Sequence, residues 1–592
     1  MKSNLLHKIL NLEHLLSLIF GASVFVFFAL YYPFHLHYQE QYQLFLFTKR
    51  YFFEYLSKPG GISNYLGNFF TQFYFYSTIG ALFIALFLTL LQQLFLKSIK
   101  RFGDSAIFWP LSFIPSALYF SLLCNENILL GGLIAIIIIT AFNLIYINIK
   151  TTRIRIITLL ISLPILYWVA GGAVVFSLLF IILWELFLKD LKTKYLLFLG
   201  FISLIVTATV PLIAGKYFLQ YPMKRIWIGV EYFRFPEIFF PQIAVIGIVI
   251  GTVPYFAYAI SKKIRHSLKS IVVAVQLLII FPGSYLLLSK STDMPKEEVM
   301  AYDFYTRMRK WEDVIALADQ KTPMSPLSVT CLNLALAQQD QLGEKMFTYY
   351  QNGIQGLIPD FTRDYTIPTI AGEVYYHLGM INVSQRFAFE AMEALPDYQK
   401  STRSLKRLTE TNLINGSYPI AEKYLKLLQK TFYYKRWANN VQSQLNDENF
   451  INAHREWGWL RQCRVKDDFL FSEDERDMML GILFTQNKQN KMAFDYLLAY
   501  CLLNKDLEHF WQYFQMGQSF YSQHIPTHFQ EALLYYWTSK NTDLSKKFPF
   551  PVSAQVRDNF TNYHNIYVSN MDAKPLLQKN YSDTYWYYFH FR

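Results

Sequence analysis

One acidic residue stands at an unusual place, shortly after the first long apolar run of the chain. Glu40 follows the run 15–30 and lies in a polar cluster with Gln39, Gln41 and Gln43. A carboxylate held beside a membrane can act as a general base that takes a proton from an acceptor hydroxyl. Its simpler interpretation is a solvated acid at a helix end. Glu40 is the candidate catalytic residue.

A second group of residues suited to chemistry lies in the segment 215–237. Lys224, Arg225 and Arg234 stand there among aromatic residues. Basic side chains bind phosphate oxygens, and Arg can do so through two parallel hydrogen bonds. We predict phosphate binding by these three residues. The alternative is a belt of cations and aromatics at the membrane edge, which any multi-span protein carries.

Glu54 is a further, weaker candidate for substrate binding. It lies on a predicted helix, four residues after Arg50. Pairing of residues at this spacing explains an exposed acid without any function.

Metal binding has one signal, the alternation of His35 and His37. In an extended segment the two would share a face with Glu40, and a divalent cation could bind there. The spacing matches no zinc motif, so a polar belt at the membrane edge is the favoured interpretation. No metal ligand and no certain cofactor is assigned.

The elements that must position these residues begin with a surface helix. Apolar residues recur at helical spacing over 44–56, with charged residues on the other faces. This pattern is typical of a helix that lies flat in the membrane interface. The turn Pro59-Gly60-Gly61 ends it.

Long apolar runs fill the first half of the chain. Most approach the ~20 residues that a helix needs to cross a bilayer. We predict a polytopic bundle of about nine spans over 1–290, with external loops 31–76 and 215–237 and membrane lipid around it. The runs are 15–30, 77–96, 106–123, 128–147, 156–170, 172–188, 195–214, 238–260 and 270–289.

Charge separates the two halves of the chain and orients the first. Residues 1–290 hold 23 Lys and Arg against 9 Asp and Glu, whereas the remainder holds 32 and 34. Alternate ends of the spans carry 15 and seven basic residues, so the positive-inside rule predicts a cytoplasmic N-terminus. The segment 291–592 is then extracytoplasmic. The near-neutral tail offers no basic patch for nucleic acid.

The pattern of the tail, residues 291–592, predicts an all-α repeat domain. Segments opening at Ala388, Ala421 and Ala493 resemble one another and are spaced near multiples of the ~34-residue tetratricopeptide unit. We therefore predict a tetratricopeptide-like domain over 291–592, able to bind a protein partner.

The absence of several motifs excludes the classes of protein that depend on them. No P-loop, dinucleotide-binding glycine pattern or HExxH motif occurs in a suitable context. Cys331, Cys463 and Cys501 could form a bridge, but buried single thiols are the favoured interpretation.

The acid after the first span, the flat-helix loop and the repeat tail resemble the GT-C type of glycosyltransferase. That resemblance implies a multi-span enzyme that takes a sugar from a polyprenyl-phosphate carrier, with Glu40 at the place of the catalytic acid. Here Glu40 is flanked by Gln39 and Gln41, not by a second acid. The runs YQEQ, PGGISNYLGNFFTQF and AFDYLLAYCLLNKDL also resemble uncharacterised bacterial multi-span proteins with helical tails, which implies no activity.

Two functions therefore stand open. The first is sugar transfer from a lipid-linked donor at the outer face of the bacterial inner membrane. The alternative is a non-enzymatic scaffold whose repeat domain recruits envelope proteins. A transporter is disfavoured because few charged residues fall inside the spans.

Overall fold

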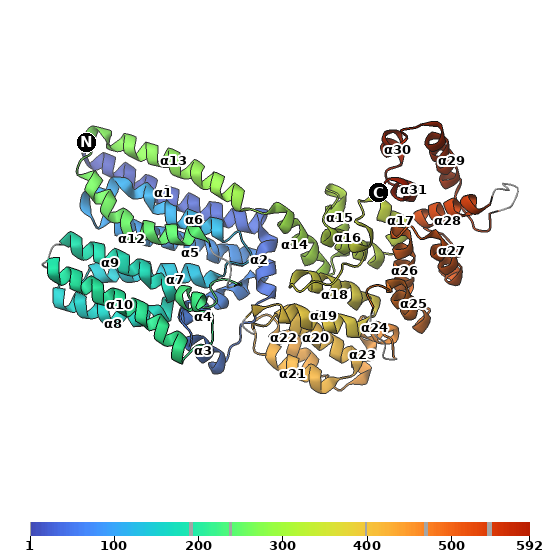
Figure 1. Ribbon diagram of the computed structural model, residues 1–592, viewed down its shortest axis with the longest axis horizontal. Helices are drawn as coiled ribbons and strands as arrows, with labels where there is room; N and C mark the ends of the chain where they lie inside the picture. Colours follow the sequence, from blue (N-terminus) through green and yellow to red (C-terminus); the bar gives the residue numbers. More distant parts are fainter. Residues whose placement is uncertain (1, 189–192, 236–239, 397–398, 467–471, 542–547) are drawn as a thin grey trace. The chain divides into compact units, whose positions relative to one another are not determined.

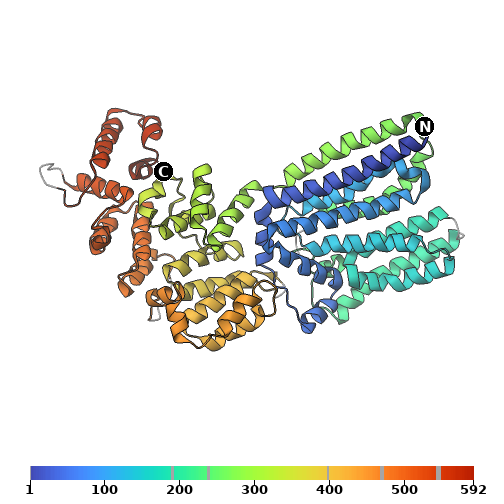
Figure 2. The ribbon, with the colours of Figure 1, turned by 180° about the vertical axis from the view of Figure 1, so that it is seen from behind.

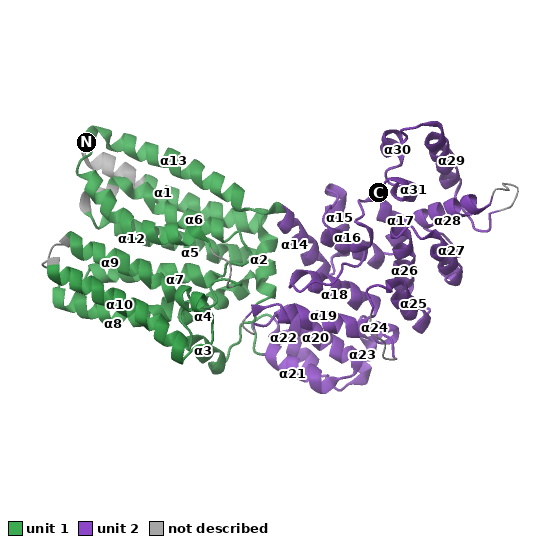
Figure 3. Ribbon diagram, viewed as in Figure 1, with its two compact units in different colours: residues 1–294, 430–433 green, residues 295–429, 434–592 purple. Residues whose placement is uncertain are grey.

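The structure, a computed structural model, describes the whole chain except residues 1, 189–192, 236–239, 397–398, 467–471 and 542–547. Two compact units make up the chain (Figure 3). Unit 1 comprises Met1–Met294 and Lys430–Tyr433, and unit 2 comprises Pro295–Gln429 and Tyr434–Arg592. The described residues are helical in both units, as predicted. The end of the predicted loop 215–237 and the start of the run 238–260 lie outside the described residues.

Unit 1 is a bundle of long helices joined by short ones (Figures 1 and 2). Its helices are α1 (Lys2–Val26), α2 (Pro33–Gln41), α3 (Lys49–Leu56), α4 (Gly61–Thr71), α5 (Ser77–Lys100), α6 (Phe113–Leu122), α7 (Leu130–Ile147), α8 (Thr152–Ala170), α9 (Val174–Leu188), α10 (Thr193–Tyr217), α11 (Met223–Ile228), α12 (Pro241–Ser261) and α13 (Lys269–Ser291), with the short turns η1 (Phe27–Tyr31), η2 (Gln72–Phe75), η3 (Gly103–Ser112), η4 (Gly171–Ala173) and η5 (His266–Leu268).

Several of these helices have the length and composition that a membrane span needs. Among the described residues seven qualify, with Thr152–Phe187 taken as one, and Ile107–Leu122 is a shorter apolar helix. The turn η4 divides Thr152–Phe187 into α8 and α9. Large apolar side chains also face outward, and Phe218 and Leu278 are each 72% exposed. Apolar surface of this extent suits lipid, in agreement with the prediction of a helical membrane protein.

The segment 31–76 is more helical near its start than predicted. Residues 33–41 form α2, so the extended geometry that the disfavoured metal alternative for His35 and His37 required is not present. Residues two apart on a helix point in different directions, and the two imidazoles do not share a face. Pro33 at the first position favours this helix, because its missing N–H needs no partner there.

The predicted surface helix is shorter than 44–56. It begins at Lys49 because the Thr48 side chain accepts a hydrogen bond from the backbone N–H of Tyr51, at 3.2 Å, and so caps the helix. Gly60 then takes a left-handed conformation, with φ +71°, and α4 follows, as the turn motif predicted.

Unit 2 consists of shorter helices packed mostly in consecutive pairs (Figure 1). They are α14 (Met294–Arg307), α15 (Trp311–Gln320), α16 (Pro326–Gln338), α17 (Leu342–Lys345), η6 (Met346–Thr348), η7 (Gly353–Gly356), α18 (Thr366–Leu378), α19 (Ile381–Glu393), α20 (Thr402–Asn415), α21 (Tyr418–Leu428), α22 (Lys435–Gln442), α23 (Glu448–Ala453), α24 (Trp457–Cys463), α25 (Arg476–Gln486), α26 (Lys491–Leu503), α27 (Leu507–Met516), η9 (Gln518–Tyr521), α28 (Thr527–Lys540), α29 (Ala554–Ser569), α30 (Lys574–Tyr581) and α31 (Tyr585–Phe591).

Five of these pairs share one turn geometry. A left-handed residue follows the first helix of each pair, at Arg309, Asp340, Gly379, Gly416 and Lys505. The amide of the next residue donates to the carbonyl five positions before it, over 2.7–2.9 Å. This hydrogen bond satisfies a carbonyl that the helix end would leave unpaired. The bonds run from Lys310 to Tyr305, Gln341 to Leu336, Met380 to Tyr375, Ser417 to Asn412, and Asp506 to Cys501.

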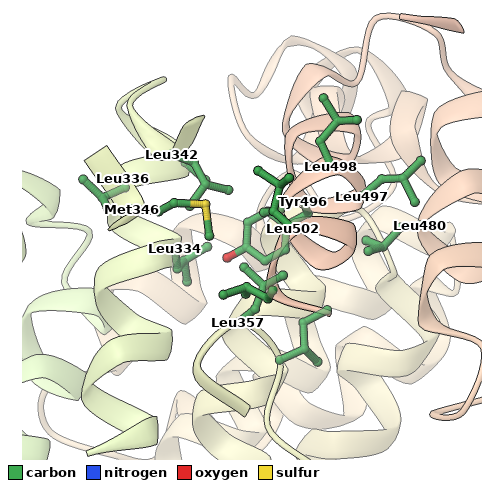
Figure 4. Packing of buried hydrophobic residues seen from close by; sticks show 14 of the residues in the cluster. Leu334, Leu336, Leu342, Met346, Leu357, Leu480, Tyr496, Leu497, Leu498 and Leu502 are labelled. Carbon is green, nitrogen blue, oxygen red and sulfur yellow. The ribbon is translucent and has the colours of Figure 1, made fainter. Parts of the chain in front are cut away.

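The core of unit 2 is a large cluster of leucines and aromatics. Figure 4 shows Tyr496 of α26 among leucines that include Leu334 of α16 and Leu357. Cys331 and Cys501 belong to this cluster, and Cys463 is buried too, all as free thiols. Burial raises the pKa of Cys331 to about 12, so its thiol stays protonated and unreactive.

Unit 2 also buries a network of charges. Arg403 contacts Asp303 at 2.7 Å and Glu373 at 3.1 Å, and Arg407 contacts Glu373 and Glu410. Burial alone would raise the pKa of Glu373, but the adjacent guanidinium groups outweigh it and hold that pKa well below its usual range.

Candidate functional site

Helix α2 carries Glu40 in a buried position. Glu40 is 4% exposed, although the sequence suggested a solvated acid as the simpler interpretation. Its neighbour Gln39 fixes the helix, because the side-chain amide donates to the carbonyls of Ile128, at 3.0 Å, and Glu126, at 3.2 Å. The turn before α7 therefore holds the helix that bears the predicted catalytic acid.

Arg234 joins the predicted phosphate-binding loop to the same helix. Its Nη1 donates to the hydroxyl of Tyr38 at 3.4 Å, and its guanidinium carbon lies 3.9 Å from the centre of the Tyr42 ring. The backbone N–H of Arg234 donates to the carbonyl of Asn127 at 2.9 Å. Tyr38 lies two residues before Glu40, and Tyr42 two residues after it. The structure thus brings two separately predicted segments together at one end of unit 1.

Of the other two predicted phosphate ligands, one joins this cluster and one does not. Arg225 on α11 is 5% exposed, and its Nη2 donates to the carbonyl of Phe233 at 3.4 Å. Lys224, next to it, is exposed. Glu54 is likewise exposed, on α3, and is not among the buried residues of the cluster. Arg225 and Arg234 are therefore buried with protein partners, whereas Lys224 and Glu54 face solvent.

A buried ion pair nearby was not recognised from the sequence. The amine of Lys58 lies 2.8 Å from a carboxylate oxygen of Glu231, and the two side chains are 13% and 3% exposed. Tyr55 interacts with the same carboxylate through its hydroxyl, which also accepts a hydrogen bond from the amide of Asn68. Segments about 170 residues apart thus meet in one polar cluster.

The backbone around this pair is strained and tightly packed. Glu231 adopts φ +68°, a left-handed conformation that costs a residue with a Cβ roughly 1–3 kcal/mol. Its neighbour Tyr232 fills a space bounded by glycines. A Cβ on Gly60 would lie 2.6 Å from the Tyr232 hydroxyl, and one on Gly229 would lie 2.5 Å from its ring. Strain of this kind persists only where the surrounding structure fixes it, and it is frequent at functional sites.

The Glu231 carboxylate favours the charged form of Lys58. Burial would lower the pKa of Lys58, but the Glu231 carboxylate outweighs burial and raises that pKa above its usual value. Burial, and then the same carboxylate, also raise the pKa of Tyr55, whose hydroxyl therefore stays protonated. The cluster offers a fixed ammonium, a carboxylate and a phenol donor.

Sequence patterns alone could not reveal this pair. Lys58 precedes a turn, and its spacing relates it to no partner. Glu231 is an acid without an evident partner in the sequence of the basic loop 215–237. That position was the sequence signal that could have drawn attention to it. Their encounter depends on how α3, α4 and the loop after α11 pack.

Among the described residues there is no group of three or more His, Cys, Asp and Glu side chains arranged to hold a metal ion. His35 and His37 do not contribute to such a group because they lie on different faces of the helix α2. We therefore derive no step that involves a metal.

Comparison with known proteins gives one result. A family model described as a family of unknown function (DUF6057) matches residues 8–592. The chain belongs to this family. The match extends over residues of both units. No curated protein and no solved structure matches the chain.

Proposed function

We propose that this protein is a membrane glycosyltransferase of the GT-C type. It would transfer a sugar from a polyprenyl-phosphate carrier at the outer face of the bacterial inner membrane. The observation that carries the proposal is the contact of Arg234 with Tyr38 and Tyr42 on the helix that bears Glu40. Such a reaction requires a general base and a cation for the carrier phosphate, and Glu40 and Arg234 are our candidates for these two roles.

The chemistry assigns a separate role to each group. The acceptor hydroxyl attacks the anomeric carbon of the sugar, and the bond from that carbon to the carrier phosphate breaks. Glu40 takes the proton of the acceptor hydroxyl. Arg225 and Arg234 hold the phosphate oxygens and stabilise the negative charge that develops on the leaving carrier.

Topology and tail complete the proposal. With the N-terminus in the cytoplasm, the site end of unit 1 and the whole of unit 2 lie outside. We interpret unit 2 as a tetratricopeptide-like domain, an interpretation that its five equivalent turns support.

The test is rescue of the envelope glycan of a deletion strain by variants at matched protein level. Glu40→Gln keeps the shape of the side chain but cannot take a proton, so transfer should slow about 10²–10⁴-fold. Arg234→Gln should weaken binding of the carrier phosphate. Glu312→Gln, an exposed acid on α15, serves as the matched control and should rescue fully. Full rescue by Glu40→Gln would refute the mechanism.

A scaffold that recruits envelope proteins through unit 2 is the second candidate. The feature that favours it is the paired-helix architecture, which stacks helices into surfaces suited to protein partners. A scaffold requires that Glu40→Gln and Arg234→Gln be silent while deletion of residues 300–592 abolishes function. The same rescue experiment therefore separates the two functions.

A further inference from the structure

A groove of about 700 Å³ opens in unit 2 and includes none of the residues of the candidate site in unit 1. Its wall combines residues that are far apart in the chain, including Trp311 on α15, His377 on α18, Trp459 on α24 and Lys491 on α26. One hydrogen bond joins two parts of this wall. The side-chain amide of Asn490 donates to the backbone carbonyl of Leu378, at the end of α18, over 2.9 Å. The groove is thus formed by the tertiary fold.

Flat aromatic surfaces line this groove. Trp459 is 39% exposed, an unusual state for so large an apolar side chain. Trp311 is half-buried, and its ring meets that of His377 edge-on with the centres 5.2 Å apart. Tryptophan offers a ligand a wide apolar face at a small cost in conformational entropy.

The charges of the groove are already matched within it. Arg309 pairs with Glu456, and Lys491 pairs with Asp340 and with Asp495, the latter at 2.8 Å. Paired charges still offer donors and acceptors to a ligand, but they present little net charge. Arg455 at the edge is exposed, where salt screens it.

A network of contacts holds the side chain of Glu456, a hydrogen-bond acceptor in the groove, in place. Glu456 accepts a hydrogen bond from the hydroxyl of Tyr376 at 2.6 Å. The guanidinium of Arg407 in turn lies 3.5 Å from the centre of the Tyr376 ring. The buried charges described above therefore fix one wall of the groove, so that little order has to be imposed when a ligand binds.

His377 contributes a neutral polar group to the wall. Burial, reinforced by the charges of Arg309 and Arg407, lowers its pKa to about 3. Within the part of the chain that the structure describes, no group hydrogen-bonds its Nε2, and the nearest carboxylate, that of Glu373, is 3.9 Å away. A neutral imidazole can serve a hydroxyl group as donor or acceptor.

We propose that this groove binds a neutral oligosaccharide. A sugar ring has an apolar C–H face that fits against tryptophan, and hydroxyl groups around its edge that both donate and accept. Fixed, mutually paired Arg, Lys, Asp and Glu groups satisfy such hydroxyls without requiring charge on the ligand. An anionic chain would meet the carboxylates of Asp340 and Glu456 as well as the cations of the groove.

The inference stands without the transfer reaction proposed above. If both the transfer reaction and saccharide binding hold, the groove holds the acceptor or product glycan. The two proposals can fail independently of each other. Loss of transfer in Glu40→Gln leaves saccharide binding by unit 2 intact, and loss of binding leaves the roles of Glu40 and Arg234 untouched.

The test is saturation-transfer NMR and calorimetry on the full chain in lipid nanodiscs. The probes are cellotetraose, maltotetraose, mannotetraose and N-acetylchitotetraose, with tetragalacturonate as the anionic arm and a neutral Gly-Ser hexapeptide as the peptide arm. At least one neutral tetrasaccharide should bind. Trp459→Ala should lower its affinity about tenfold, as expected for loss of one ring contact.

Two variants control for folding. Trp459→Tyr retains an aromatic face and should stay within about threefold of the wild-type affinity. Trp437→Ala removes a half-buried tryptophan of α22 outside the groove and should leave affinity unchanged. The inference is overturned if no neutral tetrasaccharide binds, if only the anionic chain or the peptide binds, or if both tryptophan-to-alanine variants lose affinity equally.

Discussion

The two units differ in their apolar surface and in their buried charges. In unit 1 large apolar side chains face outward, and Arg155 pairs with Glu185 at 2.8 Å inside the bundle. In unit 2 the charges of Arg403, Glu373 and their neighbours form a connected network beside a large apolar core. Both units are all-helical, so secondary structure does not distinguish them.

The difference shows what each solvent requires. Lipid offers no hydrogen bonds, so a charged group inside unit 1 must be satisfied by close protein partners or serve a function. In unit 2 a network of charges can be buried because Arg403, Arg407 and Glu373 each have several partners. A buried polar residue of unit 1, such as Glu231, is for that reason the stronger indication of function.

The largest expected effect concerns the topology on which this comparison depends. After Arg592, only a reporter enzyme that works outside the cytoplasm should be active. After Lys269, only a reporter enzyme that works in the cytoplasm should be active. The reason is the excess of basic residues at alternate loop ends. Activity of the Arg592 fusion in the cytoplasm would place unit 2 on the wrong side for the proposed site.

The next effect concerns the network of unit 2. Residues 293–592, produced alone, should fold as a helical domain. Arg403→Ala should lower its free energy of unfolding by about 3–5 kcal/mol, because Asp303 and Glu373 lose their buried partner.

Urea unfolding followed by circular dichroism measures this loss. Arg386→Ala, which removes an exposed i,i+4 pair with Glu390, is the matched control and should change the unfolding free energy by under about 0.5 kcal/mol. Equal effects of the two substitutions would show that the network does not stabilise the unit.

A smaller effect tests the isolated pair of unit 1. Glu231→Gln leaves the amine of Lys58 without its carboxylate and should cost about 2–3 kcal/mol, less than the loss at Arg403 because Lys58 keeps some exposure. Thermal unfolding in detergent measures the loss. The double variant Lys58→Met with Glu231→Gln should recover part of it, and a double variant that equals the sum of the singles would show no coupling.

The smallest effect is the pH dependence that His377 contributes. The pKa of His377 is about 3 in the folded protein and about 6.5 in an unfolded chain. The unfolded state therefore binds an extra proton as pH falls below about 6.5, and stability is lost progressively down to about pH 3. At pH 5 this amounts to about 2 kcal/mol relative to pH 7.

Unfolding of residues 293–592 at pH 7 and pH 5 measures this contribution. His377→Phe should abolish that part of the loss, whereas His564→Gln, an exposed histidine, should not change it. An unchanged pH dependence in His377→Phe would mean that the imidazole is charged or accessible in the folded unit.

Periodicity and composition predicted the architecture for a physical reason. Apolar runs of span length and apolar residues at three- and four-residue spacing reflect burial along single helices, which is local information. Prediction of α3 and of the turn at Gly60 succeeded on the same grounds. At His35 and His37 the helix that begins at Pro33 removes the extended geometry on which the disfavoured metal alternative depended.

The candidate site was predictable only in part. Glu40, Arg225 and Arg234 attracted notice as charged residues beside apolar runs, and the structure buries all three. Their burial and the contact of Arg234 with α2 depend on packing between segments nearly 200 residues apart. Lys58 and Glu231 show no local signal of their pairing, and neither do the tryptophans that line the groove of unit 2.

The sequence by itself determined the helical class, the division into an apolar and a near-neutral half, and the charge asymmetry from which we predict the orientation. Each of these properties is set by solvent acting on neighbouring residues. Tertiary structure alone decided which charges meet, because Coulomb and hydrogen-bond energies depend on distances of a few ångströms between residues remote in sequence. The pair of Lys58 with Glu231 and the pair of Arg309 with Glu456 in the groove exist only through that packing.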